Sequence, residues 1–129
     1  MIERMIIKLK KYLPLKIETI TWDGVVFQMY GPVWNFTTLS VWRVIQHDKM
    51  IMGCDDNNAE AFANSLLNFE IIDVLIQENY LKIDPIFVLS NNMQLEIFST
   101  DTFEPWTFNI HDSGMYIATP NEPSAFDSN

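Results

Sequence analysis

Two stretches of the chain combine an indole, an imidazole and a carboxylate at the same spacing, and this combination could do chemistry. They read WRVIQHD, beginning at Trp42, and WTFNIHD, beginning at Trp106, so in both cases Trp is followed by four residues and then His-Asp. The motifs are 64 residues apart and contain both histidines of the protein, His47 and His111. A metal site wants three or four ligands. These imidazoles, with Cys54 and nearby carboxylates, would supply them only if the two turns met in space.

An architectural role explains the same motifs without any chemistry. The residues after each Trp alternate as they do in a strand, and Asp and His are frequent in turns because their short polar side chains bond the local backbone. We therefore expect Trp42 and Trp106 to pack on a sheet and the His-Asp pairs to reverse the chain, with no metal and no cofactor. One alternative stays open: a small-molecule- or metal-binding site between two halves of the protein that uses both histidines.

The chain carries no familiar motif of covalent or phosphoryl-transfer catalysis. GxSxG, a glycine-rich phosphate loop and HExxH are all absent, and the whole chain has only four glycines. Cys54 is followed by Asp55 and Asp56, whose negative charge disfavours the reactive thiolate. Neighbouring carboxylates could do acid–base work, but a chain with 17 acidic residues brings some together by chance. We expect no enzyme activity.

Two helices are predicted among the elements that position these motifs. Residues 2–13 place apolar side chains at helical spacing, and Pro14 ends the pattern. Capping residues at 55–58 precede a second helical repeat, which predicts a helix over about 57–68. The first helix, which is basic, could pack on its own domain, lie on an anionic membrane or dock on a partner. Its short length and lack of tryptophan favour the first of these over the membrane.

The rest of the chain has the period and composition of strands. KIETITW and VVFQMY flank Asp23-Gly24, a signal for a two-residue hairpin turn, and VWNFTTLSVWRVI reads as further strand. FEIIDVLIQ and YLKI follow, then IFVLS and MQLEIFS around Asn91-Asn92, and WTFNI and MYIAT around the turn at 111–114. The predicted fold class is α+β, with a mainly antiparallel β-sheet and two short helices.

The two halves of the chain repeat one another in outline. Residues 1–53 and 57–119 both read as a helix followed by a meander of strands. KIETI at 16–20 matches EIIDV at 70–74 with an offset of 54, whereas the Trp motifs have an offset of 64. We place the ten additional residues around the hairpin with Asn91-Asn92. We expect one domain over 1–119 and a disordered polar tail over 120–129.

Charge is distributed unevenly along the chain. The net charge is −9, yet residues 1–16 hold five basic side chains, and from residue 50 onward thirteen acids face a single base, Lys82. Such a field repels nucleic acid and attracts basic proteins. Acidity can also serve solubility alone. We nevertheless expect an interaction surface, with the strand acids exposed because they alternate with apolar residues. The candidate residues are Asp55, Asp56, Glu60, Asp73, Glu78, Asp84, Glu96, Asp101 and Glu104.

Other features bear on the compartment. The N-terminal segment has basic residues scattered among apolar ones and no continuous apolar core of a secretory signal. No run of about 18 apolar residues occurs, so we expect no membrane span. Cys54 is the only cysteine, which is typical of a reducing compartment. We expect a cytoplasmic protein.

One phrase, LSNNMQLEIFSTDTFEPWTF at 89–108, with a weaker echo at 22–45, resembles small immunity proteins of bacterial contact-dependent growth inhibition and related polymorphic toxin systems. The resemblance implies a binder that neutralises one cognate toxin, the C-terminal domain of a larger secreted protein. Such a toxin is often a nuclease with a basic cleft that holds phosphates. The resemblance supplies no contact residue, so the acidic candidates depend on charge alone. We expect the partner to be such a toxin, with neither nucleic acid nor membrane bound.

Overall fold

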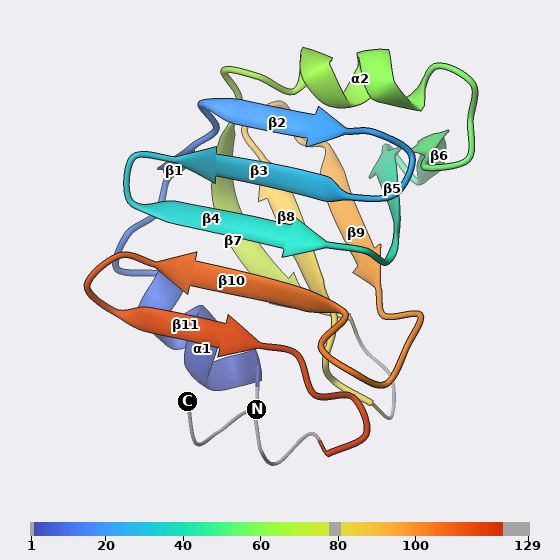
Figure 1. Ribbon diagram of the computed structural model, residues 1–129. Coiled ribbons are helices and arrows are strands. Elements are labelled where there is room, and N and C mark those ends of the chain that lie inside the picture. Colours follow the sequence, from blue (N-terminus) through green and yellow to red (C-terminus); the bar gives the residue numbers. More distant parts are fainter. Residues whose placement is uncertain (1, 78–80, 123–129) are drawn as a thin grey trace.

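The computed structural model describes residues 2–77 and 81–122, which form two antiparallel β-sheets with two short helices. The sheets stack face to face, and their strands run in different directions (Figure 1). The predicted α+β class with mainly antiparallel sheet is confirmed. Among the described residues, no helix has both the length and the apolar character needed to cross a membrane.

Each sheet draws strands from both ends of the sequence. The helices are α1 (Ile2–Leu9) and α2 (Ala59–Ser65). The six-stranded sheet has the order β1 (Leu15–Lys16), β7 (Glu70–Ile76), β8 (Pro85–Leu89), β9 (Gln94–Phe98), β5 (Val41–Gln46) and β6 (Lys49–Gly53). The five-stranded sheet has the order β11 (Gly114–Ile117), β10 (Trp106–Ile110), β4 (Trp34–Thr38), β3 (Phe27–Gly31) and β2 (Thr19–Trp22).

The core lies between the sheets and is rich in aromatic rings. Alternate residues of β4, β8 and β10 are buried, as expected for strands with one face toward a core. The ring centroids of Phe36 on β4 and Phe87 on β8 are 5.0 Å apart, and those of Phe87 and Phe108 on β10 are 6.0 Å apart. Such ring pairs stabilise a fold beyond the area that they bury. They join the two sheets.

Helix α1 docks on its own domain. Its side chains Ile2, Met5, Ile6 and Leu9 are buried, and the helix packs beside β7. The helix is shorter than the predicted 2–13, because the backbone leaves the regular helix after Leu9 and forms turns before Pro14. The second helix is likewise shorter than the predicted 57–68.

The strand order repeats within the chain. In the first half, the meander β2–β3–β4 lies in the five-stranded sheet and the hairpin β5–β6 lies in the six-stranded sheet. In the second half, the meander β7–β8–β9 lies in the six-stranded sheet and the hairpin β10–β11 lies in the other. Helix α1 packs on β7 and α2 packs on β2, so each helix meets the first meander strand of the opposite half. The halves exchange hairpins, and neither half forms a sheet of its own.

Strand register shows where the second half is longer. Ile20 pairs with Met29, and Val74 occupies the same position opposite Phe87, which gives an offset of 54. The β7–β8 connection spans 77–84, against 23–26 for β2–β3, and the β9–β10 connection spans 99–105, against 39–40 for β4–β5. The prediction that the additional residues lie around Asn91-Asn92 is therefore wrong for most of them. They lengthen the β7–β8 connection within the meander and the β9–β10 connection that follows it.

Three local predictions also need correction. The segment from Val33 to Ile45 is not continuous strand, because the chain bends at 39–40 and passes from one sheet to the other. The turn at Asp23 spans four residues, and its carboxylate accepts hydrogen bonds from the N–H groups of Val25 (2.9 Å) and Val26 (2.8 Å). Residues 81–83 form no strand, and the predicted strand's first residue lies outside the described part.

The start of the predicted tail is structured. The N–H of Glu122 donates to the carbonyl of Thr119 at 3.0 Å, and the Thr119 hydroxyl donates back to the Glu122 carbonyl at 3.0 Å. Residues 123–129 of the predicted disordered tail lie outside the described residues.

Candidate functional site

The two Trp–His–Asp motifs are turn-forming hairpins. Trp42 and Trp106 are buried in the core. His47 and Asp48 form a two-residue turn between the paired residues Gln46 and Lys49, and both adopt positive φ, 52° and 62°. The second turn is one residue longer: His111, Asp112 and Ser113 link the paired residues Ile110 and Gly114. The architectural interpretation of both motifs is confirmed.

The two histidine turns do not come together. The β5–β6 turn rests on the β8–β9 turn, where the side-chain amide of Gln46 donates to the carbonyl of Asn91 at 2.9 Å. The β10–β11 turn rests on the β3–β4 turn, where the N–H of His111 donates to the carbonyl of Val33 at 2.8 Å. The turns lie on different sides of the molecule (Figure 1). Within residues 2–77 and 81–122, no three His, Cys, Asp or Glu side chains gather where they could hold a metal ion.

Two of the eight acidic candidates that the structure describes are buried, which contradicts the expected exposure. Glu96 is 8% exposed, because β9 lies between β8 and β5 in the middle of its sheet. Its carboxylate pairs with the guanidinium of Arg43, directly opposite on β5, at 2.5 Å. Arg43 also lies over the ring of Phe98, 4.8 Å from its centroid. Glu96 therefore neutralises an arginine within the sheet and is not available to a partner.

Asp84 is the second buried acid, also 8% exposed. Its carboxylate accepts hydrogen bonds from the N–H of Ser99 at 2.8 Å and from the Ser99 hydroxyl at 2.5 Å. Burial raises the pKa of Asp84, and the bonds from Ser99 and from the Trp106 indole oppose that rise. The carboxylate ties the end of the β7–β8 connection to the start of the β9–β10 connection. Asp84 is thus a structural anchor.

Two more candidates lie apart from any common surface. Asp73 is half-buried on β7, and its carboxylate accepts a hydrogen bond from the N–H of Val74 at 2.9 Å. Glu60 is exposed on the first turn of α2 and lines a separate polar hollow with Asn57 and Asn64. Glu78 lies outside the described residues.

The remaining four candidates border one surface. The β4–β5 bend lies against the β9–β10 connection, since the N–H of Leu39 donates to the carbonyl of Pro105 at 3.3 Å and the N–H of Thr100 donates to the Ser40 hydroxyl at 3.4 Å. These contacts set Asp101 and Glu104 beside the bend. Asp55 and Asp56 follow β6 and lie with Val41 around a hollow of about 380 Å³.

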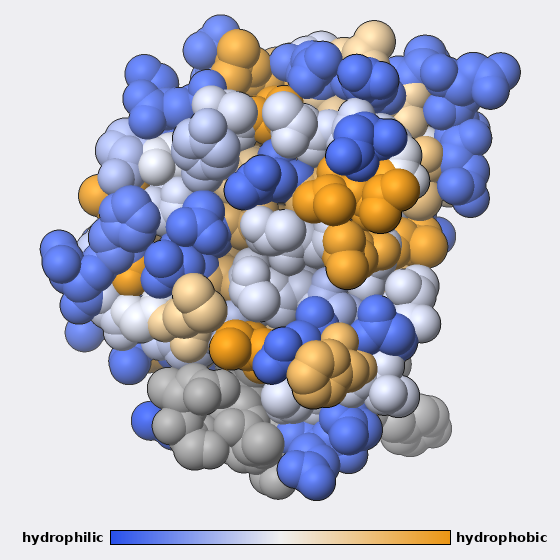
Figure 2. Space-filling view, in the orientation of Figure 1, coloured by the Kyte–Doolittle hydropathy of each residue, from blue (hydrophilic) through white to orange (hydrophobic). Residues whose placement is uncertain are grey.

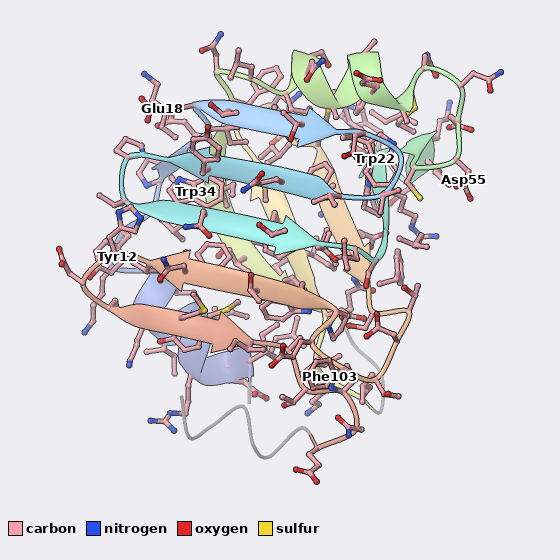
Figure 3. The ribbon with its side chains drawn as sticks, in the orientation of Figure 1. Tyr12, Glu18, Trp22, Trp34, Asp55 and Phe103 are labelled. Atoms are coloured by element: carbon pink, nitrogen blue, oxygen red, sulfur yellow. The ribbon has the colours of Figure 1, made fainter. Side chains whose placement is uncertain are left out.

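Apolar side chains occupy the middle of this surface. Leu39 is 59% exposed, and Phe103, in the β9–β10 connection, is 77% exposed. Val25 is 65% exposed, and the pairing of Phe27 with Thr38 sets its loop beside Leu39. Figure 2 shows apolar atoms gathered over the β2–β3 and β4–β5 connections, at the right of the view. Figure 3 shows Asp55 on this side, at the upper right, and Phe103 apart from it in the lower part of the view.

We call this region the acidic–apolar surface. The floor of its hollow includes the buried Trp42, and its wall includes Cys54 and Phe98. Asp23 adds a further carboxylate, and hydrogen bonds from the N–H groups of Val26 and Val25 lower its pKa. The apolar members are Val25, Leu39, Val41, Met50 and Phe103, and the acidic members are Asp23, Asp55, Asp56, Asp101 and Glu104.

Sequence reasoning from charge missed the apolar half of this surface and Asp23. A usable signal was present, because Val25 directly follows the turn residues Asp23-Gly24 and Leu39 stands in a Thr-Thr-Leu-Ser break. Large apolar residues in turns are the ones most often left exposed. Only the contact between the bend and the β9–β10 connection reveals that they share one surface.

The chain matches no protein-family model, no curated protein and no solved structure. The geometry and charge of the acidic–apolar surface are therefore the basis for assigning a function.

Proposed function

We propose that this chain is an immunity protein that binds and neutralises a cognate toxin domain through the acidic–apolar surface. The observation that carries the proposal is the exposure of Leu39 and Val25 on neighbouring connections, beside carboxylates that the same and adjoining connections carry. An apolar patch with a polar rim is typical of protein–protein interaction sites. The resemblance of residues 89–108 to immunity proteins supports the same class of function.

The charge of the surface favours a basic partner. Its five acids face one nearby arginine, Arg43, whose charge is offset by Glu96. A toxin that cleaves nucleic acid presents a positive cleft to phosphates, and the carboxylates would attract that cleft as the phosphates do. Complementary charge accelerates encounter, and the desolvated apolar centre then slows dissociation. A basic nuclease domain is the partner that fits a surface whose charges speed association and whose apolar centre slows dissociation.

The decisive experiment is co-expression with the protein encoded directly upstream, followed by measurement of toxicity and of binding. We expect toxicity without this chain, protection with it and a stable complex. Replacing Asp55 by Asn and Glu104 by Gln should slow association at least about tenfold at low salt, because rim charges act on the association rate. Leu39→Ala should mainly accelerate dissociation.

A matched control makes the same change in charge elsewhere. Asp112→Asn with Glu18→Gln alters two exposed acids away from the surface, and Glu18 lies at the opposite, upper left side in Figure 3. We expect this pair to bind at the normal rate. The proposal fails if the upstream protein is neither toxic nor bound. It also fails in its choice of surface if the control pair slows association as much as the test pair does.

A further inference from the structure

The outer edge of β7 is unpaired over most of its length within the described part of the chain. On one side β7 pairs with β8 from Ile71 to Ile76. On the other side β1 pairs with residues 70 and 71 only. Residues 72–76 therefore have no described strand beside them on that side. At about 3.3 Å per residue, this stretch is roughly 16 Å long.

The hydrogen bonds of β7 show which backbone groups face outward. The N–H of Gln77 donates to the carbonyl of Asp84 at 3.0 Å, toward β8. Since the direction alternates along a strand, the peptide groups of Val74 and Ile76 point away from β8. The N–H of Val74 is capped by the neighbouring carboxylate of Asp73 at 2.9 Å, as expected where no strand supplies a carbonyl. Exposed edges of this kind are templates for another strand.

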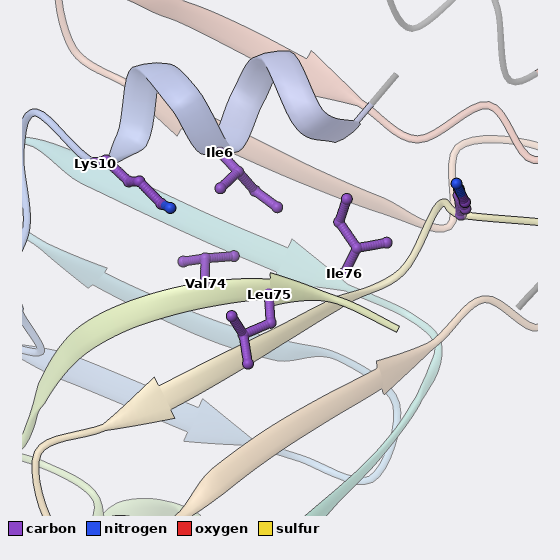
Figure 4. Close-up of a pocket in the computed structure, with 6 residues that line it drawn as sticks. Ile6, Lys10, Val74, Leu75 and Ile76 are labelled. Carbon is purple, nitrogen blue, oxygen red and sulfur yellow. The ribbon is translucent and has the colours of Figure 1, made fainter. Parts of the chain in front are cut away.

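A groove runs between this edge and α1. It has a volume of about 450 Å³ and is lined by Ile6, Lys10, Val74, Leu75, Ile76 and Lys82. Figure 4 shows Val74 and Ile76 pointing toward Ile6 of the helix, with Leu75 on the other side of the strand. Apolar side chains line the groove on both sides, so both faces of a strand inserted there would contact apolar groups. The charged groups among the lining residues are both ammonium groups.

We propose that the β7 edge is a second interaction site, which takes an extended, acidic and apolar peptide segment of a partner protein as an added strand. The backbone of the segment would pair with the outward groups of Val74 and Ile76, and would displace the Asp73 carboxylate from the N–H of Val74. Successive side chains of the segment would lie by turns on the side of Ile6 and on the side of Leu75 (Figure 4). Carboxylates of the segment would meet Lys10 and Lys82. This partner chemistry is opposite in charge to that of the toxin proposed above, so the two sites would take different partners.

Charge also decides against a second copy of this chain at the edge. An antiparallel pairing of β7 with β7 of another copy would bring two basic grooves together. The charged residues that line each groove are Lys10 and Lys82, so like charges would come together in such a pair. An acidic segment replaces that repulsion by attraction.

The test uses the full chain and the synthetic peptide Glu-Glu-Val-Thr-Val-Thr-Val-Glu-Glu with blocked ends. We expect amide NMR shifts and slowed hydrogen exchange centred on Val74 and Ile76. Lys10→Glu should weaken binding about fivefold, the effect of one exposed ion pair, whereas Lys49→Glu on β6 should leave it unchanged. Thermal melts of both variants establish that they are folded.

Two peptides separate strand addition from general adhesion. Each is N-methylated at alternate residues, one on the valines and one on the threonines. Only the peptide whose methylated N–H groups face β7 should lose binding, because the other edge of an added strand faces solvent. If both peptides lose binding equally, or both keep it equally, the proposed strand pairing is overturned. The proposal is also overturned if millimolar acidic peptide leaves these amides unperturbed, if the same peptide with Lys in place of Glu binds equally well, or if the chain dimerises through this edge.

Discussion

The buried carboxylate of Asp84 gives a prediction that connects stability with the candidate surface. It holds both the N–H and the hydroxyl of Ser99, the first residue of the β9–β10 connection. That connection carries Asp101, Phe103 and Glu104 to the acidic–apolar surface. Asp84→Ala removes the acceptor and leaves two donors of a half-buried residue without their partner. We expect a less stable protein whose β9–β10 connection exchanges amide hydrogens faster.

The magnitude follows from the number of donors released. A buried donor without a partner costs about 1–3 kcal/mol. Water can partly replace the carboxylate at half-buried Ser99, so we expect Asp84→Ala to lower the free energy of unfolding by about 2–3 kcal/mol. Asp84→Asn keeps one acceptor oxygen and removes the buried charge. It should cost about 1 kcal/mol at neutral pH, the value of one hydrogen bond.

The pH dependence of the difference in stability between the wild type and Asp84→Asn tests the contribution of the buried charge. Burial raises the pKa of Asp84 above its ordinary value of 3.8. A raised pKa means that the folded state binds the proton more tightly than the unfolded state, so protonation stabilises the fold. This contribution is complete below about pH 3.8 and is lost as the pH rises through the raised pKa. The stability of the wild type relative to Asp84→Asn should therefore fall as the pH is raised from below 3.8 to neutral.

Urea unfolding followed by tryptophan fluorescence measures these differences, since the chain has four tryptophans. Taking the difference between wild type and Asp84→Asn removes the titration of the other acids. A difference that stays constant over this pH range would refute the desolvation argument. A loss below about 0.5 kcal/mol for Asp84→Ala, the range of ordinary surface substitutions, would refute the anchoring role.

Three further predictions concern the core, the sheet and metals. Gly31→Ala should lower the free energy of unfolding by about 2–5 kcal/mol, because the added methyl group meets the Lys16 carbonyl and displaces the Trp34 indole that donates to that carbonyl at 3.0 Å. Gly24→Ala has open space around the methyl group but a φ of 96°, so it should lower the free energy of unfolding by about 1 kcal/mol. Urea unfolding of the two variants measures the difference. Arg43→Ala and Glu96→Gln should each destabilise by about 1–2 kcal/mol and their effects should be non-additive in a double-mutant cycle, with additive effects contradicting the ion pair. Zn²⁺, Ni²⁺ and Mn²⁺ should leave the melting temperature unchanged, and a rise with any of them would show a metal site that the separated histidine turns do not predict.

Much of the local structure could be predicted from short-range patterns. The burial of Trp42 and Trp106, the turns at His47 and at His111, and the two helices follow from periodicity and turn chemistry within about ten residues. Such patterns are set by the chain's own backbone geometry, so they survive whatever the strands later pair with.

The candidate surface could be predicted only in part. Charge alone predicts Asp55, Asp56, Asp101 and Glu104, because charged side chains in connections are mostly exposed. Asp84, in the β7–β8 connection, is the exception among the candidates that the structure describes. Glu96 was misplaced because alternation along a strand identifies two faces and does not say which of them a neighbouring arginine or a second sheet will cover. Exposure on a strand is a property of its neighbours.

The sequence by itself determined the antiparallel α+β class, the turn positions and the acidic character of the C-terminal part, since these depend on composition and on residues close together in the chain. The tertiary structure decided that the halves exchange hairpins, that Leu39 lies beside Pro105, and that Asp84 and Glu96 are buried. These contacts join residues between 15 and 66 positions apart, such as Asp84 with Ser99 and Leu39 with Pro105. Their geometry follows from strand pairing and from the packing of the two sheets, which no local pattern specifies.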